Sequence, residues 1–119
     1  MRSLEFLVAD SASPAWRSPL RRALAHAPAG LRDVSTQATD GPLGPAAGVA
    51  GIEIETPLAR TLLARLTDLD PEKLPAIGSL AHVRTQVTHE GGDRYRLWFP
   101  QEYSDYLAHV VLDAWEGLA

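Results

Sequence analysis

The sequence contains no cysteine, and this absence removes several kinds of chemistry at once. Disulfide bonds, thiolate metal sites and cysteine nucleophiles are excluded, and nothing suggests secretion. Long hydrophobic runs are also missing. The apolar stretch near the N-terminus covers only residues 4–9 and ends at Asp10, whereas a membrane span needs about 18 apolar residues. We therefore expect a soluble cytoplasmic protein without a signal peptide or a membrane segment.

Known catalytic and phosphate-binding motifs are missing as well. The segment GPLGPAAG at residues 41–48 matches neither GxGxxG nor a P-loop, and the chain has no GxSxG nucleophile elbow. None of the four histidines has a partner at the spacing of HxxxH or HExxH, so we interpret them as solvated surface residues. We predict no catalytic, cofactor-binding or metal-ligating residue in this chain. The four histidines are His26, His82, His89 and His109.

Length and charge set further bounds. The chain has 119 residues, which predicts a single domain over residues 1–119. Hydrophobic residues make up 45% of it, which is enough for a folded core. The formal net charge is −4, and this argues against nucleic acid or an anionic membrane as the main partner.

The N-terminal half shows weaker patterns. Residues 4–8 alternate as in a strand, a helix is predicted to start at Ser18–Pro19 and to end by Pro28, and residues 31–35 form a short strand candidate. Residues 36–50 contain three glycines and two prolines. They predict a long Gly/Pro-rich loop, and such loops are usually functional, partner-bound or mobile.

Residues 51–119 carry the clearest pattern, which is strand, helix, hairpin and helix. Ile52 and Ile54 alternate with glutamates, and a helix follows Pro57. Two strands at 81–88 and 94–99 are joined by glycines suited to a tight turn. This order predicts an α+β fold with an antiparallel sheet and helices packed on one face, including a ferredoxin-like βαββα unit over residues 51–119. The last helix repeats apolar residues on one face: Tyr103, Tyr106, Leu107, Val110, Val111, Ala114, Trp115 and Leu118.

Two glutamates on the first strand of this unit allow two interpretations. Glu53 and Glu55 share one face of the strand, and paired carboxylates can act in general acid–base chemistry. We favour a structural role, in which they form the solvent-facing side opposite Arg84, Arg94 or Arg96.

The last helix raises a similar question. Asp105, His109 and Asp113 align at i, i+4 and i+8, as a carboxylate–histidine relay would. No serine or cysteine nucleophile is placed with them. We therefore interpret these residues as a charged helix surface.

Tryptophan and arginine residues suggest a partner interface. Arg84, Arg94, Arg96 and Trp98 are predicted to share one sheet face, and Trp16 lies in a turn before the first helix. Both residue types are enriched at interface hot spots. The equally weighted alternative is that the N-terminal segment of the chain itself covers Trp98.

Several motifs resemble the gamma subunit family of heterotetrameric sarcosine oxidase, which is related to the folate-binding domain of the glycine-cleavage aminomethyltransferase. The resemblance extends over about two-thirds of the chain and includes the segment from Ser18 to Ser35. In the C-terminal half it is carried by Pro57, Ala59, Leu62, Leu63, Ala64, Asp68–Asp70, Arg84–Thr85, Asp93–Leu97 and Tyr103–Leu107.

The resemblance implies a non-catalytic accessory subunit of a flavoenzyme complex that oxidises N-methyl amines and passes the one-carbon unit to tetrahydrofolate. Its partners would be alpha, beta and delta-type subunits. FAD, FMN, NAD and tetrahydrofolate would be bound by those partners and none by this chain. The alternative is a standalone homo-oligomeric module that binds folate or another small ligand, and an independent enzyme is the least favoured reading.

Overall fold

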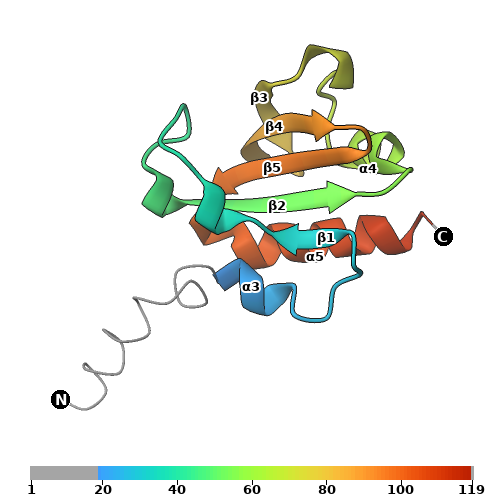
Figure 1. Ribbon diagram of the computed structural model, residues 1–119, viewed down its shortest axis with the longest axis horizontal. Helices are drawn as coiled ribbons and strands as arrows, with labels where there is room; N and C mark the ends of the chain where they lie inside the picture. Colours follow the sequence, from blue (N-terminus) through green and yellow to red (C-terminus); the bar gives the residue numbers. More distant parts are fainter. Residues whose placement is uncertain (1–18, 119) are drawn as a thin grey trace.

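A computed structural model describes residues 19–118 of the chain (Figure 1). The predicted strand at residues 4–8 and the candidate interface residue Trp16 lie outside these residues. The helices are α3 (Pro19–Ala23), α4 (Ala59–Leu66) and α5 (Ser104–Glu116), and the strands are β1 (Leu31–Asp33), β2 (Val49–Glu55), β3 (Ala76–Leu80), β4 (Val83–Gly91) and β5 (Arg94–Pro100).

The described strands form one sheet in the order β1-β2-β5-β4-β3, and each neighbouring pair is antiparallel. Strands β3, β4 and β5 follow one another as a meander. Strand β2 pairs with β5, and the chain then passes through α4 to reach β3 at the opposite edge. The predicted α+β class with an antiparallel sheet is therefore confirmed.

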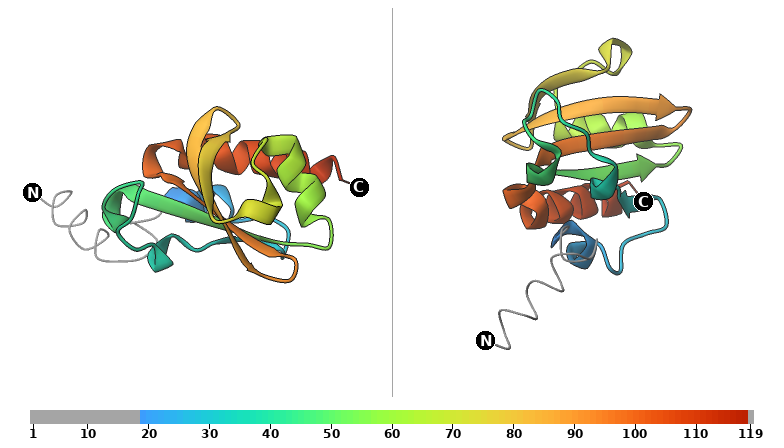
Figure 2. Two further views of the ribbon diagram at one scale, coloured as in Figure 1. Left: turned by 90° about the horizontal axis from the view of Figure 1, so that it is seen from above. Right: turned by 60° about the vertical axis from the view of Figure 1, so that its left-hand side comes forward.

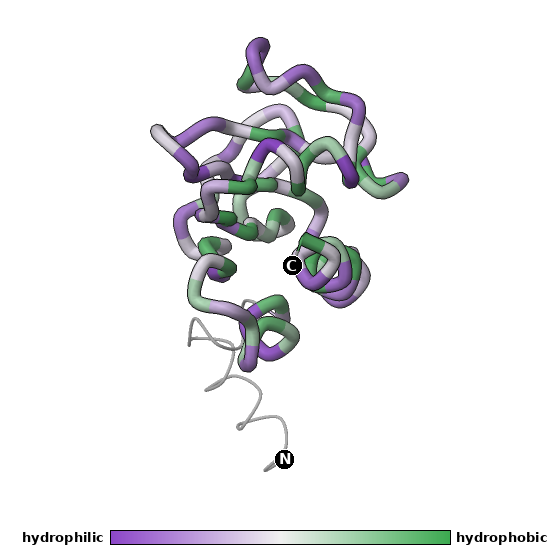
Figure 3. Tube along the Cα trace, turned by 90° about the vertical axis from the view of Figure 1, so that its right-hand side faces the viewer, coloured by the Kyte–Doolittle hydropathy of each residue, from purple (hydrophilic) through white to green (hydrophobic). Residues whose placement is uncertain are grey.

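The three described helices lie on one face of the sheet (Figures 1 and 2), as predicted. Alternation along the strands explains this layer, because every second residue of β2 and β5 is apolar and points toward the helices. Figure 3 looks nearly along α5 and shows its hydrophobic and hydrophilic residues on different sides. No helix among residues 19–118 is long and apolar enough to cross a membrane. The core includes Leu20, Ile52, Ile54, Leu62, Leu97, Phe99, Leu107 and Val111.

The ferredoxin-like detail of the prediction is wrong. Strand β3 was missed, so the C-terminal unit is βαβββα, and all its pairings within the described sheet are antiparallel. Ala81 and His82 are the turn between β3 and β4, with φ of 50° and 71°. Neither is a residue type typical of a turn with positive φ, so the sequence carried no signal for this hairpin. The second turn has Gly91 and Gly92 at positive φ, as expected.

Two other boundaries differ from the predictions. Strand β2 already begins at Val49, inside the predicted loop, so the loop between β1 and β2 (the β1–β2 loop) covers residues 34–48. This loop is internally bonded, since the amide of Ala46 donates to Asp40 Oδ1 at 2.7 Å. Tyr103, just before α5, and Tyr106 on α5 are not part of the buried face, because their exposed fractions are 42% and 44%.

Candidate functional site

The face of the sheet opposite the helices, called here the outer sheet face, brings together the predicted interface residues of β4 and β5. The strand register pairs Glu53 with Arg96, Glu55 with Arg94 and Gly51 with Trp98. On the other side of β5, Trp98 pairs with Gln86, which places Arg84 two residues along the same face of β4. The predicted opposition of the two glutamates to arginines on β5 is therefore confirmed.

Glu53 is the centre of this face. Its exposed fraction is 1%, so the prediction that it faces solvent is wrong. Arg96 Nε donates to Glu53 Oε1 at 2.9 Å, and Arg32 Nη2 forms an ion pair with Oε2. The side chains of Arg32 and Arg96, one from each flanking strand, are 53% and 20% exposed. Long arginine side chains can lie over a neighbour while their charged ends reach water, which accounts for the burial of this carboxylate.

The ion pairs continue across the sheet. Glu55, which is solvent-facing as predicted, lies 3.7 Å from Arg32, and Glu90 lies 3.9 Å from Arg96 Nη1. Thr88 Oγ1 donates to the Glu90 carboxylate at 2.6 Å. A buried carboxylate is tolerated only when it is paired and hydrogen-bonded. Arg96 supplies the hydrogen bond at Glu53 Oε1 and Arg32 supplies the opposite charge beside Oε2. The network therefore fastens β1, β2, β5 and β4 together.

Arg84 and Arg94 differ from these paired arginines. Arg84 is exposed on β4 and has no carboxylate partner among residues 19–118. Arg94 Nη2 donates to the backbone oxygen of Glu90 at 3.3 Å and likewise has no described carboxylate partner. Both guanidinium groups therefore retain hydrogen-bonding capacity toward a molecule outside this chain.

Trp98 is covered by its own chain. Its exposed fraction is 9%, and it packs with Val34 and Val49 and against Leu43 of the β1–β2 loop. On β2, Gly51 makes room for the ring, because a Cβ there would lie 2.4 Å from it. Trp98 is therefore covered, but among the described residues its cover is the β1–β2 loop and not the N-terminal segment that the alternative named. Trp98 does not present an exposed ring to a partner.

The histidines are all exposed, as predicted. His109 Nε2 lies 3.6 Å from Asp113 Oδ2, with side chains 79% and 68% exposed. So exposed a pair has the character of a surface contact. Within residues 19–118, no three histidine or acidic side chains are grouped so that they could hold a metal ion.

A second polar cluster, which the sequence did not reveal, lies on the helix side. Arg60 of α4 donates to the Tyr95 hydroxyl at 3.2 Å and to the Glu72 carboxylate at 2.7 Å. Glu72 and, to a lesser extent, Tyr95 raise the pKa of Arg60. The His89 ring stacks on Tyr95 with centroids 4.5 Å apart. These residues are far apart in sequence, and the contacts fasten the segment after α4 to the sheet.

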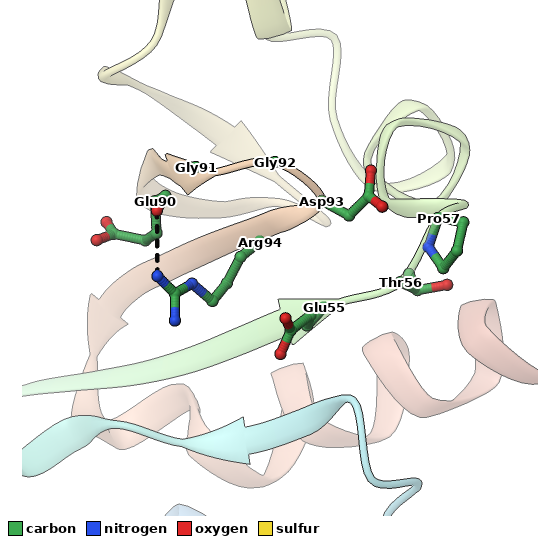
Figure 4. Close-up of a pocket in the computed structure, with 8 residues that line it drawn as sticks. All are labelled: Glu55, Thr56, Pro57, Glu90, Gly91, Gly92, Asp93 and Arg94. Atoms are coloured by element: carbon green, nitrogen blue, oxygen red, sulfur yellow. Dashed lines mark hydrogen bonds between the residues drawn. The ribbon is translucent and has the colours of Figure 1, made fainter.

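A hollow of about 570 Å³ lies at the turn between β4 and β5 (Figure 4). Its volume is in the range of ligand sites. The carboxylates of Glu55, Glu90 and Asp93 line it, but Figure 4 shows that they point in different directions. The hydrogen bond drawn there, from Arg94 to the Glu90 backbone, joins two lining residues to each other. The lining is acidic and does not converge on one point.

Comparison with known proteins adds no relative. A scan of protein families finds none that matches this chain, and no curated protein sequence matches it. The outer sheet face and its residues therefore carry the functional argument.

Proposed function

We propose that this chain is a non-catalytic, gamma-type accessory subunit of a cytoplasmic flavoenzyme complex resembling heterotetrameric sarcosine oxidase. The observation that carries the proposal is the part of the outer sheet face around Arg84, Arg94 and Arg96, which ion pairs hold in place and which no described α-helix covers. The loop at residues 34–48 covers the end of this face at Trp98. A two-layer α+β domain buries one sheet face under its helices and leaves the other available for contacts with another protein.

The motifs that carry the family resemblance divide into two groups in the structure. Ala59, Leu62 and Leu107 are buried, so packing explains them. Arg84 and Asp105 are exposed and make no contribution to the core. Exposed residues in a resembling motif support a contact outside the chain, and an accessory subunit requires such a contact.

The proposed division of labour leaves the chemistry to other chains. The alpha, beta and delta-type subunits would hold FAD, FMN, NAD and tetrahydrofolate, and would oxidise the N-methyl amine and transfer its one-carbon unit. This chain would contribute a docking surface. A nucleic-acid or membrane partner is not proposed, since the formal net charge is −4.

The second candidate, a standalone homo-oligomeric module for folate or another small ligand, would need a hollow such as the one at the β4–β5 turn. Three carboxylates and one arginine line this hollow. The carboxylates of folate would meet like charges there, which disfavours its binding. Titration with tetrahydrofolate, followed by tryptophan fluorescence, tests this candidate. We expect no saturable change, and a saturable change would move the module ahead of the subunit.

Co-expression tests the subunit proposal directly. The tagged chain should be produced together with alpha, beta and delta-type subunits, and the product separated by size exclusion. We expect the chain to elute with flavin absorbance as one complex, and the complex made without it to be less stable. A stable homo-oligomer of this chain with no affinity for the flavoprotein would refute the proposal.

A further inference from the structure

We infer that the outer sheet face over β3, β4 and β5 docks an acidic segment of the partner subunit, with Arg84 as the main contact and Arg94 as the second. This inference rests on the proposed function and deepens it. Its basis is the charge balance of the face and the contrast between this face and the surface of α5.

The acidic groups of the outer sheet face are already engaged. Glu53 is held by Arg32 and Arg96, and these same arginines also approach the carboxylates of Glu55 and Glu90. Within the described residues, the cations of this face without a carboxylate partner are therefore Arg84 and Arg94. Arg84 offers its donors to an incoming carboxylate, and a guanidinium can bind a carboxylate through two parallel hydrogen bonds. Arg94 borders the acidic hollow and already donates to the Glu90 backbone, which makes it the weaker contact of the two.

On the opposite side of the molecule, α5 carries the other sign of charge, whereas α3 and α4 carry arginines. The α5 segment SDYLAHVVLDAWE contains no lysine or arginine. Its acidic residues Asp105, Asp113 and Glu116 are exposed, and Glu102 just before it is exposed too. An acidic partner is therefore repelled by the surface of α5 and attracted to Arg84 on the outer sheet face, which favours docking on that face.

The surroundings of Arg84 fit a protein contact. The register places Arg84 beside Ser79, and the neighbouring row pairs Gln86 with Ile77. Ile77 is only half-buried and stands on the edge strand β3, so it offers an apolar contact next to the guanidinium. Arginine beside an apolar group is the composition of interface hot spots.

Charge-reversal variants test whether binding of the partner depends on the outer sheet face. The variants Arg84→Glu and Arg84→Glu/Arg94→Glu should be compared with Arg22→Glu, which changes the charge by the same amount as the first but lies exposed on α3. Each full-length variant is added to the purified complex of the remaining subunits, and the Kd is measured by biolayer interferometry. We expect Arg84→Glu to weaken binding about tenfold or more and the double variant to weaken it further, while Arg22→Glu stays within about twofold of the original chain.

The same chain can be tested without the partner. A ¹⁵N-labelled sample is titrated with a hexaglutamate peptide, and amide shifts are mapped along the described residues. We expect the largest shifts at residues 77–88 and 94–96, and loss of these shifts in Arg84→Glu. Circular dichroism of each variant verifies that it is folded.

The outcomes are distinct. If the original chain binds the complex and Arg84→Glu binds equally well, the proposed function stands and this inference is overturned. If the original chain does not bind, the proposed function fails, and the peptide titration alone decides about the surface. Shifts that are absent, or that centre on α3, then overturn the inference.

Discussion

Replacing Glu53 with glutamine measures how much the buried ion pair stabilises the fold. Glutamine keeps the shape and an oxygen acceptor for Arg96 Nε, but it removes the charge between Arg96 and Arg32. Removing one partner of a fully buried pair costs about 3–5 kcal/mol. Arg32 is 53% exposed and Arg96 20% exposed, so both can regain water, and the loss should approach the value of a charged hydrogen bond. We expect a loss of about 2 kcal/mol in the free energy of unfolding.

Urea unfolding, followed by tryptophan fluorescence, measures this loss. A decrease of about 2 kcal/mol corresponds to a fall in the midpoint of about 1 M when the m-value is about 2 kcal/mol/M. The m-value itself should not change, because the same surface is exposed on unfolding.

Glu55 on the same strand provides the matched control. It is 57% exposed and lies 3.7 Å from Arg32. Glu55→Gln should therefore lower the free energy of unfolding by less than about 0.5 kcal/mol, as for other surface ion pairs. A Glu53→Gln variant no less stable than Glu55→Gln would refute the role assigned to the buried carboxylate.

Three further substitutions have defined expectations. Gly51→Ala places a Cβ 2.4 Å from the Trp98 ring, and this overpacking should lower the free energy of unfolding by about 1–3 kcal/mol and change the near-UV circular dichroism signal. An unchanged melting point would contradict the close packing. His82→Gly relieves a φ of 71° and should raise the free energy of unfolding by about 0.5–1 kcal/mol in a urea titration, whereas destabilisation would contradict the turn geometry. Tyr95→Phe removes the acceptor for Arg60 at 3.2 Å and should lower the free energy of unfolding by about 0.5–1.5 kcal/mol, as measured by thermal unfolding. This loss should vanish when Arg60 is already replaced with methionine.

Much of the sheet could be predicted because it follows simple alternation. Ile52 and Ile54 had to face the helices, which left Glu53 and Glu55 on the other side. The glycines after Glu90 marked the β4–β5 turn and thereby set the faces of both strands. The opposition of Glu53 and Arg96 could be proposed from these local signals alone.

The features that could not be predicted depend on contacts between distant segments. The burial of Glu53 requires Arg32 from β1. The sequence contains no pattern that predicts the pairing of β1 with β2. The cover over Trp98 is a loop whose glycines and prolines indicated only irregular structure. Strand β3 was missed since the turn before β4 consists of Ala81 and His82 instead of glycine or asparagine.

The position of β2 between β1 and β5 has a consequence for the order of folding. Residues 76–116 form the meander and α5 through short connections, which close quickly. Strand β2 joins them by pairing Ile54 with Tyr95 across a long stretch of chain, and β1 pairs within the described sheet only with β2. The Arg32–Glu53 contact therefore forms after the folding transition state. Arg32→Gln should speed unfolding in stopped-flow measurements and leave the refolding rate nearly unchanged, because this ion pair slows the unfolding of the native protein.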